Sequence, residues 1–105
     1  MKITQKGLKE LLRYDGRSGR FFWRESARFG QILAGSEAGG RSLQYIQIVL
    51  DGRHYLAHRL AWLYIYGRWP KEIDHKNNNG FDNRFSNLRE ASRSENRGNQ
   101  KIRKD

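Results

Sequence analysis

Apolar positions near the N-terminus recur at helical spacing. Leu8, Leu11 and Leu12 fall on one face of a helix, because residues three and four apart lie side by side. Thr4, which precedes them, is a residue type that commonly caps helix N-termini. The pattern therefore predicts a short helix that runs from Thr4 to about Arg13.

The next segments change from helical spacing to turn and strand composition. The sequence YDGRSGR at residues 14–20 is typical of a turn, and RFFWRE at residues 20–25 is aromatic enough to predict a strand. Residues 25–42 are rich in Gly, Ser and Ala, so they indicate loops with one short strand at most.

The middle of the chain carries the clearest pattern. The apolar, partly β-branched run Tyr45–Leu50 predicts a strand, Asp51-Gly52 a tight hairpin turn, and Arg53–Leu56 the returning strand. From about Ala57 the spacing becomes helical and ends near Gly67, with Pro70 just beyond. The apolar face of this helix is formed by Leu56, Leu60, Leu63 and Tyr64.

Shorter elements are expected after Pro70. Residues 72–75 predict a short strand, residues 77–80 a loop of turn-forming asparagines, and residues 87–91 a second strand. Ser92 with Glu95 three residues later fits a capping box, so we expect a terminal helix to begin there.

The chain is strongly basic. It has 21 Lys and Arg against 11 Asp and Glu, a formal net charge of +10 in 105 residues, which favours a polyanionic partner. The basic residues are dispersed rather than gathered on one amphipathic helix, so nucleic acid is favoured over an anionic membrane. No cysteine is present, which excludes disulfides and cysteine-ligated metal. No leader-like or membrane-spanning run is present, and a cytoplasmic location is expected.

One cluster of residues suggests a reaction. Asp74-His75 lies on the strand after Pro70, and Asn96 lies on the terminal helix, which can pack across the two short strands. A carboxylate and an amide are hard oxygen ligands that suit Mg²⁺ or Mn²⁺. An adjacent neutral imidazole can activate a water, and the metal can stabilise charge on a phosphate. The combination fits phosphodiester hydrolysis.

This order of residues resembles the HNH endonucleases, whose ββα-metal fold is built from the same order of elements. His75, Asn87 and Asn96 match the three motif positions, in an H-N-N variant. The sequences HRLAWLYIYG at residues 58–67 and NRFSNL at residues 83–88 are similar to the phage and intron-associated branch, which includes homing endonucleases.

The resemblance implies a role for each motif residue. His75 would be the general base, Asp74 and Asn96 would bind the metal, and Asn87 would hydrogen-bond the loop backbone and so orient His75. Asn99, one helical turn later, is an alternative to Asn96. Hydrolysis in the manner of the family would leave 5′-phosphate and 3′-hydroxyl ends.

The sequence departs from the zinc-bearing members of that family. Where those proteins have paired cysteines, this chain has Ser92 and Glu95, so no structural zinc is expected. Apolar packing by Leu60, Trp62 and Leu88 is expected to hold the small hairpin instead.

Other polar residues leave alternatives open. His58 is interpreted as a buried, hydrogen-bonded histidine or a brace beside the active site, and His54 as solvated or near DNA. Asn83 can cap or brace the loop, or touch a phosphate. The candidates for DNA contact are Arg41, Arg53, Arg84, Arg93, Arg97 and Lys101.

The sequence thus predicts an α+β protein. Residues 1–52 would form a helix and hairpin region that contacts DNA, and residues 53–105 the ββα-metal module. The expected function is a divalent-metal-dependent DNA endonuclease, encoded by a phage or mobile element. It would nick as a monomer or cut both strands as a homodimer. The alternatives are a non-catalytic DNA-binding protein on the same fold and a protein directed at RNA.

Overall fold

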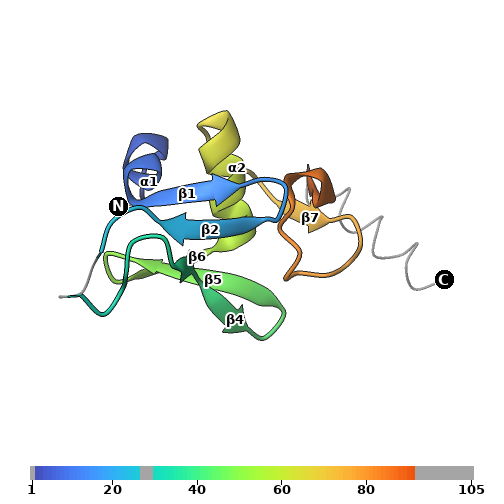
Figure 1. Cartoon of the computed structure of the whole chain (residues 1–105). Helices are drawn as coiled ribbons and strands as arrows, with labels where there is room; N and C mark the ends of the chain where they lie inside the picture. The colour runs from blue at the N-terminus through green and yellow to red at the C-terminus, as the bar shows by residue number, and fades with distance from the viewer. Residues whose placement is uncertain (1, 27–29, 92–105) are drawn as a thin grey trace.

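The computed structural model describes residues 2–26 and 30–91 (Figure 1). These residues form two α-helices, one short 3₁₀ helix (η1) and eight strands in three small antiparallel sheets, which confirms the α+β prediction. None of their helices is long and apolar enough to cross a membrane. The elements are α1 (Gln5–Leu11), β1 (Leu12–Asp15), β2 (Arg20–Trp23), β3 (Glu37–Ala38), β4 (Gly40–Ser42), β5 (Tyr45–Leu50), β6 (Arg53–Leu56), α2 (Ala57–Tyr66), β7 (Ile73–His75), η1 (Phe85–Asn87) and β8 (Leu88–Glu90).

Helix α1 begins as the sequence predicts but ends earlier. The Thr4 side chain accepts a hydrogen bond from the Gly7 backbone N–H at 3.1 Å. The predicted end at Arg13 is wrong, because Leu12 is already extended, with φ −132° and ψ 151°, and starts β1. In that strand Leu12 and Tyr14 both point into the core, which a continued helix would not allow.

Residues 25–42, which were expected to be mostly loop, contribute one short strand to each of two sheets. Strand β1 pairs with β2, and β3 pairs with the other edge of β2. Strand β4 pairs with β5 in the second sheet. The prediction of one short strand at most in residues 25–42 is therefore wrong by one strand, because each short strand is stabilised by a partner outside the segment.

The middle of the chain follows its sequence pattern. Strands β5 and β6 have the predicted bounds and are joined by Asp51 (φ 49°) and Gly52 (φ 77°), as a type I′ turn requires. Helix α2 ends at Gly67, whose left-handed backbone (φ 78°) lets its N–H donate to the Leu63 carbonyl at 2.9 Å.

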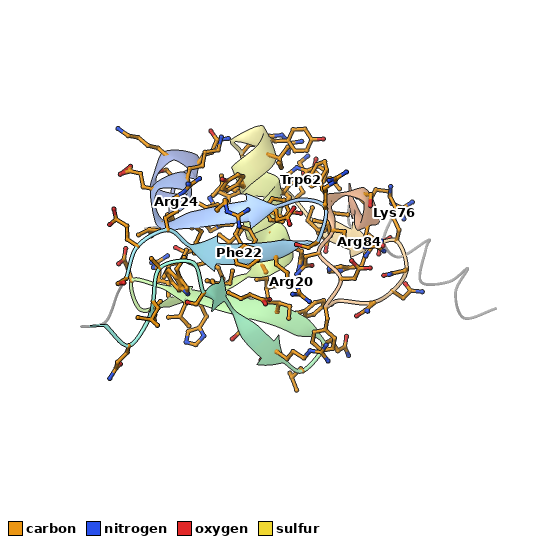
Figure 2. The ribbon with its side chains drawn as sticks, in the orientation of Figure 1. Arg20, Phe22, Arg24, Trp62, Lys76 and Arg84 are labelled. Atoms are coloured by element: carbon orange, nitrogen blue, oxygen red, sulfur yellow. The ribbon has the colours of Figure 1, made fainter. Side chains whose placement is uncertain are left out.

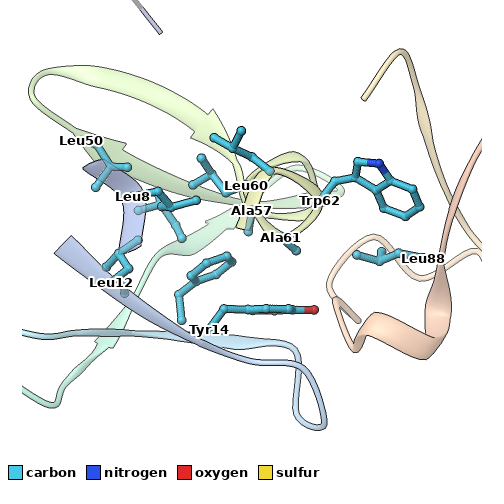
Figure 3. Packing of buried hydrophobic residues seen from close by; sticks show 13 residues of the cluster. Leu8, Leu12, Tyr14, Leu50, Ala57, Leu60, Ala61, Trp62 and Leu88 are labelled. Atoms are coloured by element: carbon cyan, nitrogen blue, oxygen red, sulfur yellow. The ribbon is translucent and has the colours of Figure 1, made fainter. Parts of the chain in front are cut away.

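A single apolar core joins the N-terminal elements to the rest (Figure 3). Leu60 is fully buried, and Trp62 and Leu88 are nearly so, as expected for residues that hold the small hairpin. Side chains from α1, β1 and β2 pack into the same cluster: Leu8, Leu12, Tyr14 and Phe21.

The last described elements form a two-stranded hairpin. In β7 and β8, Asp74 pairs with Arg89 and His75 with Leu88. A long connection that contains η1 joins the two strands. The predicted terminal helix from Ser92 lies outside the described residues.

Candidate active site

A cleft of about 630 Å³ opens beside strand β7. The tip of the β4–β5 hairpin, the start of α2 and the loop after β7 form its walls. Tyr45, His58, Asp74, His75 and Phe81 are among the residues that line it. The sequence-predicted base and one predicted metal ligand therefore lie in the same cavity.

The His75 side chain is fixed in one orientation. It is only 6% exposed, and its Nε2 lies 2.8 Å from the Asn83 Oδ1. The Asn83 amide presents its oxygen to the ring, which assigns the proton to Nε2 and leaves the lone pair on Nδ1. This is the tautomer that a base acting through Nδ1 needs.

Asn83 is itself held by the N-terminal hairpin. The Tyr14 hydroxyl donates a hydrogen bond to the Asn83 carbonyl at 2.6 Å, and burial raises the pKa of Tyr14, which keeps the phenol protonated. Gly19, in the turn after β1, lies so close that a Cβ there would collide with the backbone of Asn83 and Arg84. A chain of contacts thus connects Tyr14 to Asn83 and Asn83 to His75.

Asparagine side chains shape the loop after β7. Asn87 Oδ1 accepts from the Asn77 backbone N–H at 3.1 Å, and Asn87 Nδ2 donates to the Asp82 carbonyl at 2.8 Å. The Asn77 side chain accepts from the Asn79 backbone N–H at 2.9 Å, and Asn78 adopts a left-handed backbone with φ 64°. Hydrogen bonds from the asparagine side chains therefore stabilise this loop, which has little regular secondary structure.

Asp74 is paired with a cation across the hairpin. Its Oδ2 lies 2.6 Å from an Arg89 guanidinium nitrogen, and its side chain is only 12% exposed. No group of three or more His, Cys, Asp or Glu side chains is arranged as a metal site within residues 2–26 and 30–91. One carboxylate at a cleft fits a hard divalent ion that takes its other oxygens from phosphate and water. The other predicted ligand, Asn96, and its alternative, Asn99, lie outside the described residues.

A second histidine packs against the first. The His58 ring is 4.7 Å from the His75 ring, edge to face, and is 5% exposed. Burial, followed by the charges of His75 and Arg59, lowers the pKa of His58 to about 3, so its ring is neutral at pH 7. Its burial beside the site is as predicted, but Nδ1 makes no hydrogen bond with any described residue. His54 is exposed, and its Nδ1 is 3.2 Å from Gln47 Oε1.

The arginines predicted to contact DNA do not all lie at one place. A second groove, of about 330 Å³, is lined by Arg20, Arg41 and Arg84 among others, and Figure 2 shows Arg20 and Arg84 near one another. The Arg41 guanidinium lies 4.4 Å from the centre of the Phe81 ring, while Arg84 is already ion-paired with Asp82 at 2.8 Å. Arg53 is exposed at the start of β6. Arg93, Arg97 and Lys101 lie outside the described residues.

Comparison with known proteins agrees with this geometry. The region around the cleft consists of α2, the β7–β8 hairpin and the asparagine-braced loop between the two strands. Residues 55–97, which include this region, match the sequence model of a family described as HNH endonuclease.

A solved structure has the same fold. It is a structure of DNA binding and cleavage by the HNH homing endonuclease I-HmuI, with a TM-score of 0.68 and 22% sequence identity. The match covers 98% of this chain and 59% of the I-HmuI chain, so this chain spans little more than half of that protein. No curated protein sequence matches the chain.

Proposed function

We propose that this protein is a divalent-metal-dependent DNA endonuclease that hydrolyses phosphodiester bonds. The observation that carries the proposal is the buried His75, whose Nε2 proton is fixed by Asn83 at 2.8 Å while the adjacent Asp74 lines the same cleft. The family match at residues 55–97 and the fold of I-HmuI support a DNA endonuclease.

In the proposed reaction, His75 Nδ1 removes a proton from a water aligned with the scissile phosphate. Asn83 stabilises the imidazolium that forms, because its amide oxygen accepts a hydrogen bond from the Nε2–H throughout. Asn87 holds the loop that positions His75 and Asn83. Asp74 and Asn96 would hold Mg²⁺ or Mn²⁺, which would supply positive charge to the phosphate and to the departing 3′ oxygen. The P–O3′ bond breaks and the departing 3′ oxygen takes a proton from solvent water, so the products are 5′-phosphate and 3′-hydroxyl ends.

DNA is the proposed partner. The net charge of +10 provides sequence-independent attraction to phosphates, and the N-terminal region adds contacts beyond the module at residues 53–105. One site per chain makes a nick, and a homodimer would cut both strands. We place the activity in the cytoplasm. If the gene is carried by a phage, this is the cytoplasm of the host cell. The proposed phosphate contacts are Arg41, Arg53, Arg84, Arg93, Arg97 and Lys101.

Plasmid cleavage tests the proposal directly. Supercoiled plasmid is incubated with the protein and Mg²⁺ or Mn²⁺, with EDTA as the control, and the cut ends are tested for ligation. Conversion to nicked or linear DNA with ligatable ends supports the proposal. Binding without cleavage in either metal would contradict it.

The ion pair at Asp74 favours one alternative, a non-catalytic DNA-binding protein. Arg89 donates to the carboxylate at 2.6 Å and so supplies positive charge where a metal would bind. In an active nuclease the metal must compete with Arg89 for this carboxylate. The two functions therefore predict different effects for loss of Arg89.

Arg89→Gln is expected to lower the Mg²⁺ concentration that gives half-maximal cleavage. The half-exposed Arg89 contributes at most about 1 kcal/mol to such a pair, so a shift of roughly twofold to fivefold is expected. Metal titrations of the cleavage rate measure it. Arg68→Gln is the matched control, since it removes the comparable 2.7 Å ion pair with Glu90. An increase in the required Mg²⁺ would show that Arg89 assists the metal instead.

Asn83→Ala is expected to reduce kcat by roughly 10- to 100-fold with little change in KM, because loss of a hydrogen-bond partner that orients a site histidine has about this cost. Asn83→Asp retains an acceptor oxygen and is expected to recover most of the rate. Steady-state kinetics on plasmid DNA measure both variants. Equal activity of Asn83→Ala and wild type would remove Asn83 from the mechanism.

A further inference from the structure

The tip of the β4–β5 hairpin carries an unusual leucine. Ser42 pairs with Tyr45, which leaves Leu43 and Gln44 as a two-residue loop. Leu43 is 96% exposed, the highest value among the large apolar side chains that the structure describes as exposed. A leucine in solvent at this position contributes no core packing.

The backbone at Leu43 is also unfavourable for leucine. Its φ is 53°, in the left-handed region, where the Cβ of a non-glycine residue is crowded. Hairpin turns with positive φ at the first loop position favour glycine there. Turn geometry and core packing therefore both argue against leucine, and residues in strained backbone at such sites are often functional.

The hairpin tip forms one wall of the catalytic cleft. Leu43, Gln44 and Tyr45 line the cleft together with Asp74 and His75. The same three residues also line a second, more apolar hollow, so Leu43 borders both.

This wall is held rigidly against the catalytic loop. Gly80 packs against the tip so closely that a Cβ there would collide with the Gln44 carbonyl oxygen and the Tyr45 ring. This packing holds the backbone next to Leu43 against the loop after β7, and Leu43 lies at the edge of the cleft that His75 lines.

The surroundings select duplex DNA as the group that Leu43 contacts. Arg41 lies two residues away, Arg59 lines the cleft, and the chain carries a net charge of +10. Apolar side chains that project from basic DNA-binding surfaces insert between base pairs, unstack the step and kink the duplex. His75 is only 6% exposed, so a phosphate must enter the cleft to reach it, and a kink lets the backbone do so.

We propose that Leu43 is a wedge that inserts between stacked base pairs next to the scissile phosphate and distorts the duplex so that the phosphate reaches His75. This inference takes DNA as the substrate and therefore rests on the proposed function. Its insertion requires no catalysis, so it can be tested in a protein that does not cut.

The first experiment measures DNA unwinding. Relaxed plasmid is saturated with His75→Ala protein, treated with topoisomerase I and deproteinised, and the linking number is read on gels. Insertion unwinds the duplex, so His75→Ala is expected to shift the linking number. The double variant with Leu43→Gly is expected to shift it much less at equal occupancy. Leu33→Gly on the same background is the matched control, since Leu33 is 64% exposed and does not line the cleft.

Equal linking numbers with and without Leu43 would overturn the wedge, whatever the cleavage assay shows. A change in oligomeric state of Leu43→Gly without DNA, together with unaltered unwinding, would assign the leucine to a protein interface and also overturn it. Absence of cleavage by wild type in any metal contradicts the proposed nuclease alone, since the unwinding result stands separately.

The second experiment asks whether distortion limits cleavage. Leu43→Gly is expected to cut paired duplex roughly tenfold more slowly, because unstacking a base step is costly, and to recover on a duplex with a mismatch at the mapped cut site. Leu43→Met, which keeps an apolar wedge, is expected to retain activity. Thermal unfolding of Leu43→Gly should show equal or higher stability. Slow cleavage that the mismatch does not rescue would contradict the wedge.

Discussion

His75→Ala is expected to slow metal-dependent DNA cleavage by roughly 10²- to 10⁴-fold, the usual contribution of a general base. The expectation follows from the imidazole, which lines the cleft with its Nε2 fixed on Asn83 and its Nδ1 lone pair left for a water. Single-turnover nicking of supercoiled plasmid at saturating protein measures the rate of the chemical step. Binding measured by gel shift is expected to be little changed, because the phosphate attraction lies elsewhere on this basic chain.

Two controls separate chemistry from folding. His54→Ala removes an exposed histidine that lies 3.2 Å from the Gln47 side chain, and it is expected to cut like wild type. His75 packs against His58 and Tyr45, so His75→Ala must also be shown to unfold cooperatively. Full cleavage by a folded His75→Ala protein would exclude His75 as the base.

The sequence predicted the elements whose patterns are local. The β5–β6 hairpin and α2 were found because Asp51-Gly52 and Gly67 mark their ends with turn chemistry. Strand β1 was missed because Leu12 continues the helical spacing of α1. The strand is instead stabilised by pairing with β2, in which Leu12 faces Trp23, eleven positions away. Short strands such as β3 and β4 depend on partners that local composition does not reveal.

The candidate site was likewise predicted only where its residues follow a local motif. The motif led to Asp74, His75 and Asn87, and the structure places all three in or beside the cleft loop. The sequence leaves Asn83 either to cap or brace the loop or to touch a phosphate, and it does not indicate the hydrogen bond with His75, which depends on how the loop folds back. The Arg89 partner of Asp74 follows from the register of β7 and β8, which the two short predicted strands did not fix.

The N-terminal hairpin is part of the site's support. Besides the bond from Tyr14 to Asn83, the Gly16 carbonyl accepts a hydrogen bond from the Phe85 N–H at 2.9 Å. The turn between β1 and β2 thus holds the backbone on both sides of Arg84. Tyr14 and Asn83 are 69 residues apart, so no local pattern could have predicted the contact.

Gly19→Ala is therefore expected to damage both stability and catalysis. Its φ of 79° is unfavourable for alanine, and the new Cβ would collide with the backbone of Asn83 and Arg84. Neither backbone can move without disturbing the bond to His75. We expect a loss of about 3 kcal/mol or more in unfolding free energy, typical of strain in a packed site. Urea unfolding measures the stability, and plasmid nicking under native conditions measures the rate.

Gly52→Ala is the matched control for this substitution. Gly52 has nearly the same φ, 77°, but a Cβ there meets nothing within 4 Å. Only the backbone cost of roughly 1 kcal/mol is expected, with cleavage unchanged. The difference between the two variants isolates the close approach of the hairpin to the catalytic loop. Equal losses in both would mean that the loop holds Asn83 and His75 in place without the N-terminal hairpin.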